Sequence, residues 1–377
     1  MNIVKKTLKV IGITIAVLIV TSLIIATLFI NLSPQFGKGA TNKQKEEYLK
    51  SGHYKDGKFV NETRTVMDIH FWKVLKNFIN ASPNRQPHST IIPEKIDSLD
   101  LVNHASTITQ LTWFGHSAFL LELDGKKILL DPMFGESPSP HPWLGGKRYS
   151  KELPIEIEKL PFIDIVIFSH DHYDHLDYGS IQKLKNKVGS FYTPLGVGNH
   201  LIAWGVPKEQ VYQLNWWDKT MFDHIELICT PARHFSGRGI RDRNTTLWAS
   251  WIIKGEKENI YFSGDGGYGP HFKEIGAKYG PFDISLMECG QYNKQWEAIH
   301  MMPEQTAQAA IDLKSNLFMP IHWGAFTLAF HDWTDPAERV ISAAKKLNLP
   351  VTTPKIGQPV VIGDENFPIE KWWLTYQ

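Results

Sequence analysis

At about 150 residues per domain, the 377 residues of this chain suffice for two or three domains or for one large one. With 13 Trp, 12 Tyr and 20 Phe, the composition excludes a disordered or collagen-like chain, because so many aromatic side chains need a packed core. Lys and Arg (40) balance Asp and Glu (39) to a formal charge of +1, so no basic field favours nucleic acid as a partner. The cysteines, Cys229 and Cys289, cannot form a disulfide framework.

The N-terminus predicts a membrane anchor over residues 1–32. Lys5, Lys6 and Lys9 precede an uncharged, strongly apolar stretch at 10–32, long enough as a helix to cross a hydrocarbon core of about 30 Å. A cleaved signal peptide has a shorter apolar region and a small-residue cleavage site, and a core helix has a polar face. Lysines flank the stretch on both sides, so the positive charges do not decide its orientation. The usual outcome for such an anchor is a cytoplasmic N-terminus, and we therefore expect the rest of the chain on the exported side.

Residues 33–106 are rich in Lys, Asn, Pro and Ser and predict an extended arm. Within it, apolar residues at 67–79 recur at helical spacing and predict an amphipathic helix. Trp72 and the lysines of this segment suit a membrane interface, whereas a helix of this kind more often docks on its own domain. We favour docking on the domain.

From Thr107 onward the pattern changes to short apolar runs of strand length, at 119–123, 127–130, 163–168, 225–229, 249–253, 260–262 and 284–287. Helical patterns occur at 303–313 and 336–347, each with Pro in its first turn. Closely spaced strands followed by alternating strands and helices predict two packed sheets with helices outside, in one domain over 107–377.

A cluster of metal-ligating residues directly follows the strand predicted at 163–168. It reads His170-Asp-His172-Tyr-Asp174-His175. His170 and His172 are separated by one residue and can converge on one ion, while Asp174 and His175 fall on the opposite side and can hold a second. Imidazole nitrogens with carboxylate oxygens favour zinc, and the same ligands also accept Fe or Mn.

Further ligands for a two-metal site follow later apolar runs, namely His234, Asp265 and His322. Alone, either histidine reads as a core residue and the Asp before Gly as a turn former. Together with the upstream cluster, they indicate a site with two ions.

These residues in this order, with Asp131 at the end of an early strand, resemble the metallo-β-lactamase superfamily over about residues 107–365. The segments Thr112-Trp-Phe-Gly-His116 and Ile299-His300-Met-Met-Pro narrow the resemblance to the branch of N-acyl phosphatidylethanolamine-hydrolysing phospholipase D and related bacterial hydrolases. The resemblance implies an αββα sandwich with two Zn²⁺ ions at one edge, between the sheets.

The resemblance also assigns roles to residues. One ion falls to His170, His172 and His234, the other to Asp174, His175 and His322, and Asp265 bridges both. A hydroxide held between ions about 3.5 to 4 Å apart is a nucleophile at neutral pH. Asp174 orients this hydroxide, and His300 lies beside the substrate phosphate or is a loop histidine without a special role. The expected catalytic residues are Asp174, Asp265 and His300.

Several other residues are weaker candidates. His116 is expected in a structural role near the metal loop, and Asp131 is expected to accept an imidazole N–H. Arg233 and Arg238 flank His234 and could meet a phosphate, although exposed arginines are common. Two loops rich in Gly, Pro and aromatic residues, 133–150 and 235–248, are expected to shape the pocket.

These observations predict a membrane-anchored binuclear metal hydrolase acting on a phosphodiester, with N-acyl phosphatidylethanolamine or a similar phospholipid as substrate. An anchored enzyme meets lipids at high effective concentration. A lactonase or β-lactamase-like hydrolase uses the same site on another bond. A non-catalytic envelope protein retaining the fold is the alternative of another class. The expected partners are the lipid bilayer and a phospholipid or other small molecule, without nucleic acid, and the sequence indicates no oligomeric state.

Overall fold

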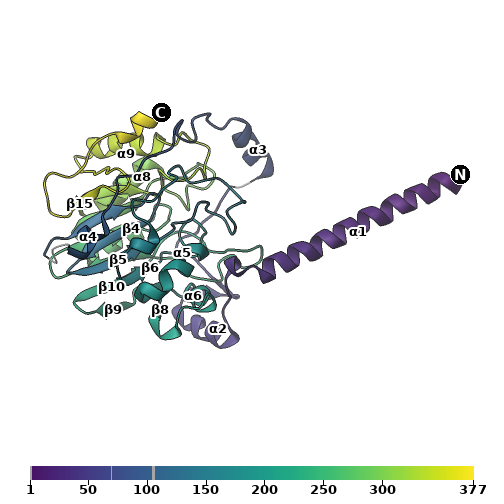
Figure 1. The fold of residues 1–377 in the computed structure, drawn as a ribbon, viewed down its shortest axis with the longest axis horizontal. Coiled ribbons are helices and arrows are strands. Elements are labelled where there is room, and N and C mark those ends of the chain that lie inside the picture. Colours follow the sequence, from purple (N-terminus) through teal and green to yellow (C-terminus); the bar gives the residue numbers. More distant parts are fainter. Residues whose placement is uncertain (1, 69, 104–106) are drawn as a thin grey trace.

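The computed structural model describes residues 2–68, 70–103 and 107–377. The first element, α1 (Asn2–Leu32), stands away from the domain as one long helix (Figure 1). Its most apolar window is 0% buried, which excludes a core helix. Within the described residues, α1 is the one helix long and apolar enough to cross a membrane, and length and composition fit both an anchor and a signal sequence.

Two mixed sheets form the centre of the domain. The order in the seven-stranded sheet is β15-β3-β4-β5-β6-β7-β8, and in the six-stranded sheet it is β14-β13-β12-β11-β10-β9. The consecutive strands from β5 through β8 pair in parallel with one another, as do those from β12 through β14. All other neighbouring strands are antiparallel. The bounds of these strands are β3 Gln110–Trp113, β4 Phe119–Leu123, β5 Lys126–Leu130, β6 Ile163–Ile167, β7 Val188–Pro194, β8 Val211–Leu214, β9 Lys219–Phe222, β10 Ile225–Thr230, β11 Ser250–Lys254, β12 Asn259–Phe262, β13 Phe282–Glu288, β14 Ser315–Ile321 and β15 Pro359–Val361.

The sheets pack face to face because successive strand residues point to opposite sides. Leu121 of β4 and Ile165 of β6 enter the same buried core as Trp251 and Ile253 of β11. Their neighbours on the outward faces, such as Val166 of β6, join separate outer cores. The interior between the sheets is thus one continuous apolar layer.

Helices cover both outer faces. On the seven-stranded sheet, α5 (Tyr178–Leu184) and α6 (Gly198–Ala203) pack into one outer core, and α7 (His271–Lys278), α8 (Pro303–Asp312) and α9 (Asp335–Lys346) pack on the other sheet. The αββα sandwich is therefore confirmed, and all seven expected strands and both expected helices are present within one or two residues at most ends. The sequence patterns did not predict strands β3, β7 to β9, β14 and β15, or helices α5 to α7, because polar residues, Gly or Pro interrupt their apolar residues.

The segment before β3 wraps around the sandwich. Its elements are α2 (Asn42–Tyr48), the hairpin β1 (Tyr54–Lys55) and β2 (Lys58–Phe59), α3 (Phe71–Ile79) and α4 (Ser98–Asn103). Tyr48, Tyr54 and Phe59 are buried in the core between the sheets. Asn61 also reaches the later chain, donating to the backbone carbonyl of His234 over 2.8 Å. This segment is therefore part of the packed body.

Helix α3 is an exception within the wrapped segment. It forms as an amphipathic helix but begins at Phe71, four residues later than the sequence pattern suggests, and none of its residues is buried. Phe71 is 71% exposed and Trp72 76% exposed. The favoured docking of this helix on its own domain is therefore wrong. Figure 1 shows α3 on the side of the domain from which α1 departs.

Candidate metal centre

The predicted ligands meet at one edge of the sandwich, where several strands end. The loop carrying His170, His172, Asp174 and His175 follows β6, His234 follows β10, Asp265 follows β12 and His322 follows β14. The carboxyl ends of parallel strands point to the same edge of a sheet, and in open α/β sheets this edge binds ligands. All these residues are described by the structure and all converge there.

One cluster contains His170, His172, His234 and Asp265, whose ligand atoms all lie within 4.8 Å of one another. His172 Nδ1 is 2.8 Å from His170 Nε2 and 3.2 Å from His234 Nε2. These are the residues that the resemblance assigns to one ion. Imidazole nitrogens facing one another at such distances suit ligands around a shared cation.

A second cluster contains His116, Asp174, His175 and His322, also within 4.8 Å. Asp265 lies between the two clusters, because its Oδ2 is 3.1 Å from His175 Nε2 and its Oδ1 is 3.0 Å from His322 Nδ1. The arrangement fits the expected bridging position. His116 joins this cluster directly, since its Nε2 is 2.9 Å from Asp174 Oδ2.

The donor chemistry of these clusters fits metal ions. His175 Nε2 and Asp265 Oδ1 are buried, and although each faces another ligand atom closely, neither makes a hydrogen bond of acceptable geometry within the described residues. Burial holds the pKa of His170 and His234 well below the ordinary range, so both rings are neutral. Burial alone would raise the pKa of Asp174 and Asp265, but the charge of His175 and other histidines outweighs it and holds both far below the usual value. Neutral imidazoles and ionised carboxylates are the forms that bind metal.

The charges around His175 favour a cation at this position. Burial lowers the pKa of His175, but the carboxylates of Asp265, Asp174 and Asp131 raise it more, to well above its usual value. Two divalent ions would compensate these carboxylates, because buried carboxylates require a positive partner. The residues present therefore fit a binuclear metal site, and the ligand types leave the identity of the metal open.

Neighbouring residues hold the ligands in place. Asp131, at the end of β5, accepts from His175 Nδ1 over 2.6 Å and from the Ser169 backbone N–H over 2.7 Å. The sequence predicts this acceptor role for Asp131. His116 and His322 join the two sheets through their backbones, since the His322 N–H donates to the His116 carbonyl over 3.0 Å. Both residues have positive φ, 58° and 68°, which turns their rings toward the same site.

His300 lies beside the clusters and forms a third group with Asp265 and His322. Its Nδ1 is 3.1 Å from Oε1 of Glu288, a fully buried residue at the end of β13 that the sequence analysis missed. Burial raises the pKa of Glu288 to about 7. The sequence does contain a signal that could have identified Glu288. It is a carboxylate directly after the apolar run at 284–287, the same signal that identified Asp131.

The two arginines beside His234 have structural contacts. Arg233 donates to the carbonyls of Tyr268 and Arg64. Arg238 is buried and donates to the carbonyls of Asp171, Leu176 and Gln35. Neither lines the pocket over the metal ligands, so the expectation that they meet a phosphate has no support in this geometry.

A pocket of about 270 Å³ opens over the ligand clusters. Loop 235–248 contributes Phe235 and Arg243 to it, as expected for this loop. Loop 133–150 contributes no lining residue, and its Trp143 instead lies 6.1 Å from Phe29 of α1, ring centre to ring centre. The full lining is Met67, His172, Asp174, Phe235, Arg243, Asp265, Gln291, Trp296, Ile299, His300, His322 and Leu328.

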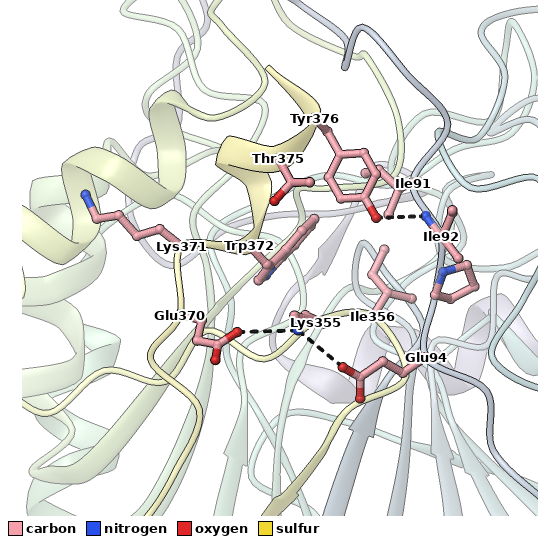
Figure 2. Close-up of a pocket in the computed structure, with 11 residues that line it drawn as sticks. Ile91, Ile92, Glu94, Lys355, Ile356, Glu370, Lys371, Trp372, Thr375 and Tyr376 are labelled. Carbon is pink, nitrogen blue, oxygen red and sulfur yellow. Dashed lines mark hydrogen bonds and ion pairs between the residues drawn. The ribbon is translucent and has the colours of Figure 1, made fainter.

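A larger groove of about 520 Å³ lies between the segment 91–94 and the C-terminal residues. Figure 2 shows Lys355 between Glu94 and Glu370, its Nζ 3.6 and 3.4 Å from their carboxylates, and the Tyr376 hydroxyl near the backbone of Ile92. None of its lining residues is a histidine. The groove is therefore separate from the metal chemistry.

Comparisons with known proteins agree with this geometry. The Beta-lactamase superfamily domain family matches residues 126–323. The uncharacterized protein Rv0906 of Mycobacterium tuberculosis is 38% identical over 337 residues, covering 86% of this chain and 87% of that protein. N-acyl-phosphatidylethanolamine-hydrolyzing phospholipase D 1 of Caenorhabditis elegans is 32% identical over 237 residues, covering 60% of this chain and 66% of that protein.

Among solved structures, the metallo hydrolase Igni18 of Ignicoccus hospitalis shares the fold at a TM-score of 0.51 and 23% identity, covering 68% of this chain and 99% of that one. The family match extends over more than half of this chain and contains every ligand that the sequence analysis named. The chain therefore belongs to the metallo-β-lactamase superfamily and is a metal-dependent hydrolase with His and Asp metal sites at the edge of its sheets.

Proposed function

We propose that this protein is a membrane-anchored binuclear hydrolase of phosphodiesters, with N-acyl phosphatidylethanolamine or a similar phospholipid as substrate and zinc as metal. The carrying observation is the pocket itself, in which the two ligand clusters, with Asp265 in contact with both, meet an apolar wall of Met67, Trp296, Ile299 and Leu328. Metals at the base suit a phosphate, and an apolar wall suits an acyl or glyceryl chain.

The likeness to the Caenorhabditis elegans enzyme supports the same substrate class, since that enzyme is named for the hydrolysis of N-acyl phosphatidylethanolamine. Helix α1 supports a membrane location. The side on which the hydrolase domain lies, the exported one, is part of the proposal. An anchored domain meets membrane lipids at an effective concentration that a free domain does not reach. The exposed apolar residues of α3 would help the domain to approach the bilayer surface.

In this mechanism, two bound divalent ions supply Lewis-acid polarisation of the phosphoryl group and a water of lowered pKa. His170, His172 and His234 would hold one ion, Asp174, His175 and His322 the other, and Asp265 both. The catalytic residues have separate tasks. Asp174, whose Oδ2 accepts from His116, orients the attacking water and accepts its proton at the other carboxylate oxygen.

His300 acts on the leaving group. Its Nδ1 is engaged by Glu288, so Nε2 is the ring nitrogen left to donate a hydrogen bond to a phosphate oxygen or to protonate the leaving oxygen. Trp296 and Ile299 line the same pocket and give the reacting groups an apolar surrounding.

The experiment uses the full chain in detergent, with bound metal quantified and release of phosphatidic acid from N-acyl phosphatidylethanolamine micelles followed. The variant His172→Ala should lose metal and activity together, while His224→Ala, an exposed histidine between β9 and β10, should retain both. Unchanged lipid cleavage in metal-replete His172→Ala would overturn the proposal.

Other outcomes select the alternatives. Two metals per chain without lipid cleavage, but with hydrolysis of an acyl-homoserine lactone or a cephalosporin, would identify a lactonase or β-lactamase-like enzyme. Metal content near zero, with no hydrolysis of any of these compounds, would identify a non-catalytic envelope protein that retains the fold.

A further inference from the structure

The pocket over the metal ligands has a single Arg or Lys among its lining residues, namely Arg243. It lies in loop 235–248, between β10 and β11. Its guanidinium carbon is 4.0 Å from the centre of the Phe235 ring, and its Nη2 is 3.8 Å from the sulfur of Met67. Stacking on an aromatic face orients the planar guanidinium and limits its hydration.

The donors of Arg243 are otherwise unused. Within the described residues, no carboxylate oxygen lies within 4.0 Å of its guanidinium, and its one hydrogen-bond acceptor is the Met67 sulfur, which accepts weakly. Arg339, in contrast, pairs with Glu304 at 2.6 Å. The charge of Arg243 is therefore available to a ligand in the pocket.

The position of Arg243 restricts what this ligand can be. Phe235 directly follows the metal ligand His234, so the guanidinium stands on the wall of the cavity that contains the reacting groups. The remaining wall is largely apolar, through Met67, Trp296 and Leu328. A planar fork of N–H donors binds phosphate through two parallel hydrogen bonds, an arrangement that lysine cannot reproduce.

We propose that Arg243 is the cationic side chain that, beside the metal centre and His300, binds the non-bridging phosphate oxygens of an amphiphilic substrate. This inference rests on the proposed function, because it assigns the recognition of the phosphate group within the same pocket. Arg243 thus takes the phosphate-binding role that the sequence analysis considered for Arg233 and Arg238, whose N–H groups donate to backbone carbonyls instead. Arg243 binds and orients the substrate and takes no part in proton transfer.

The test compares Arg243→Gln and Arg243→Lys with Arg241→Gln in the metal-loaded full chain in detergent. Arg241 is exposed, like Arg243, and lies in the same loop but does not line the pocket. Binding of inorganic phosphate is measured by calorimetry, and KM and kcat are measured on N-acyl phosphatidylethanolamine micelles. Loss of a charged hydrogen bond should weaken phosphate binding about tenfold to a hundredfold in Arg243→Gln. The lipid KM should rise in parallel, with partial rescue in Arg243→Lys and wild-type behaviour in Arg241→Gln.

The two measurements separate the two proposals. Phosphate binding that depends on Arg243, in a chain that cleaves no phosphodiester, supports the anion site and overturns the proposed function. Lipid cleavage with phosphate binding unchanged in Arg243→Gln supports the proposed function and overturns the anion site. A raised lipid KM with unchanged binding of free phosphate also overturns the anion site, because Arg243 would then contact the lipid outside its phosphate group. Equal metal content in all variants is the control for folding.

Discussion

Asp131 and His175 form a fully buried hydrogen bond, with 2.6 Å between Oδ2 and Nδ1. The bond fixes which ring nitrogen of His175 carries the proton and leaves Nε2 directed at Asp265, 3.1 Å away. Asp131 directly follows β5 and the histidine follows β6, so the parallel pairing of these two strands brings the residues together. A carboxylate behind a metal-ligating histidine both orients the ring and raises its basicity.

Replacing Asp131 by Asn should lower the affinity for the metal ion that His175 would bind. The amide of Asn lacks the negative charge. It also places an N–H group against one of the two donors, the Ser169 backbone N–H or His175 Nδ1, from which Asp131 accepts hydrogen bonds. We expect a loss of about 10- to 100-fold in affinity for one of two metals, measured by competition with a chelator. Asp100→Asn, an exposed residue of α4, is the matched control. Unchanged affinity for both metals in Asp131→Asn would show that the hydrogen bond has no such role.

Gly290 should tolerate no side chain. A β-carbon at this position would overlap the backbone carbonyl oxygen of His322, so Gly290→Ala should displace this ligand. The cost should be about 2 kcal/mol or more in the free energy of unfolding, together with weaker binding of one metal. Thermal unfolding with and without zinc measures both effects.

Gly39 provides the comparison for this variant, because a β-carbon there meets no atom within 4 Å. Gly39→Ala should match the wild-type protein in both stability and metal binding. Equal behaviour of the two alanine variants would contradict the steric argument.

Removal of the wrapped segment should destabilise the domain, whereas removal of α1 alone should not. Tyr48, Tyr54 and Phe59 are buried between the sheets, and each buried aromatic side chain contributes about 2 kcal/mol. A fragment beginning at Thr107 also lacks Asn61, which binds the backbone of His234. We expect a fragment from Ser33 to unfold cooperatively on heating and one from Thr107 to aggregate or lack a transition. A cooperative transition at equal temperature in both fragments would refute this dependence.

Helix α3 should contribute to membrane binding through its exposed apolar face. In the fragment from Ser33, Phe71→Glu combined with Trp72→Glu should lower partitioning onto phospholipid vesicles about tenfold or more, because two large apolar side chains lose their contact with lipid. Vesicle sedimentation measures this effect. Phe162→Glu alters a phenylalanine that is 60% exposed elsewhere on the domain and should have little effect. Equal losses in both variants would indicate non-specific adsorption.

Much of the fold was predictable because its signals are local. Strands β4 and β6 are short runs that are apolar except for Glu122 and Asp164 and are almost entirely buried, and a short window of sequence reveals them. Strand β9 alternates exposed and half-buried residues at the sheet edge, and its pattern is too weak to identify. The docking of α3 was predicted wrongly because an amphipathic pattern indicates that a face will be covered but does not identify what covers it.

The site divides in the same way. The sequence by itself determined the apolar helix α1 and the ligands from His170 to His322, because ligand type and position after a strand are written along the chain. Only the tertiary structure decided that His116 joins Asp174, that Glu288 supports His300, and that Arg243, rather than Arg233 or Arg238, lines the pocket. The physical reason is that these relationships join residues far apart in the chain, and their distances depend on how the two sheets pack and how the loops at their edge fold back.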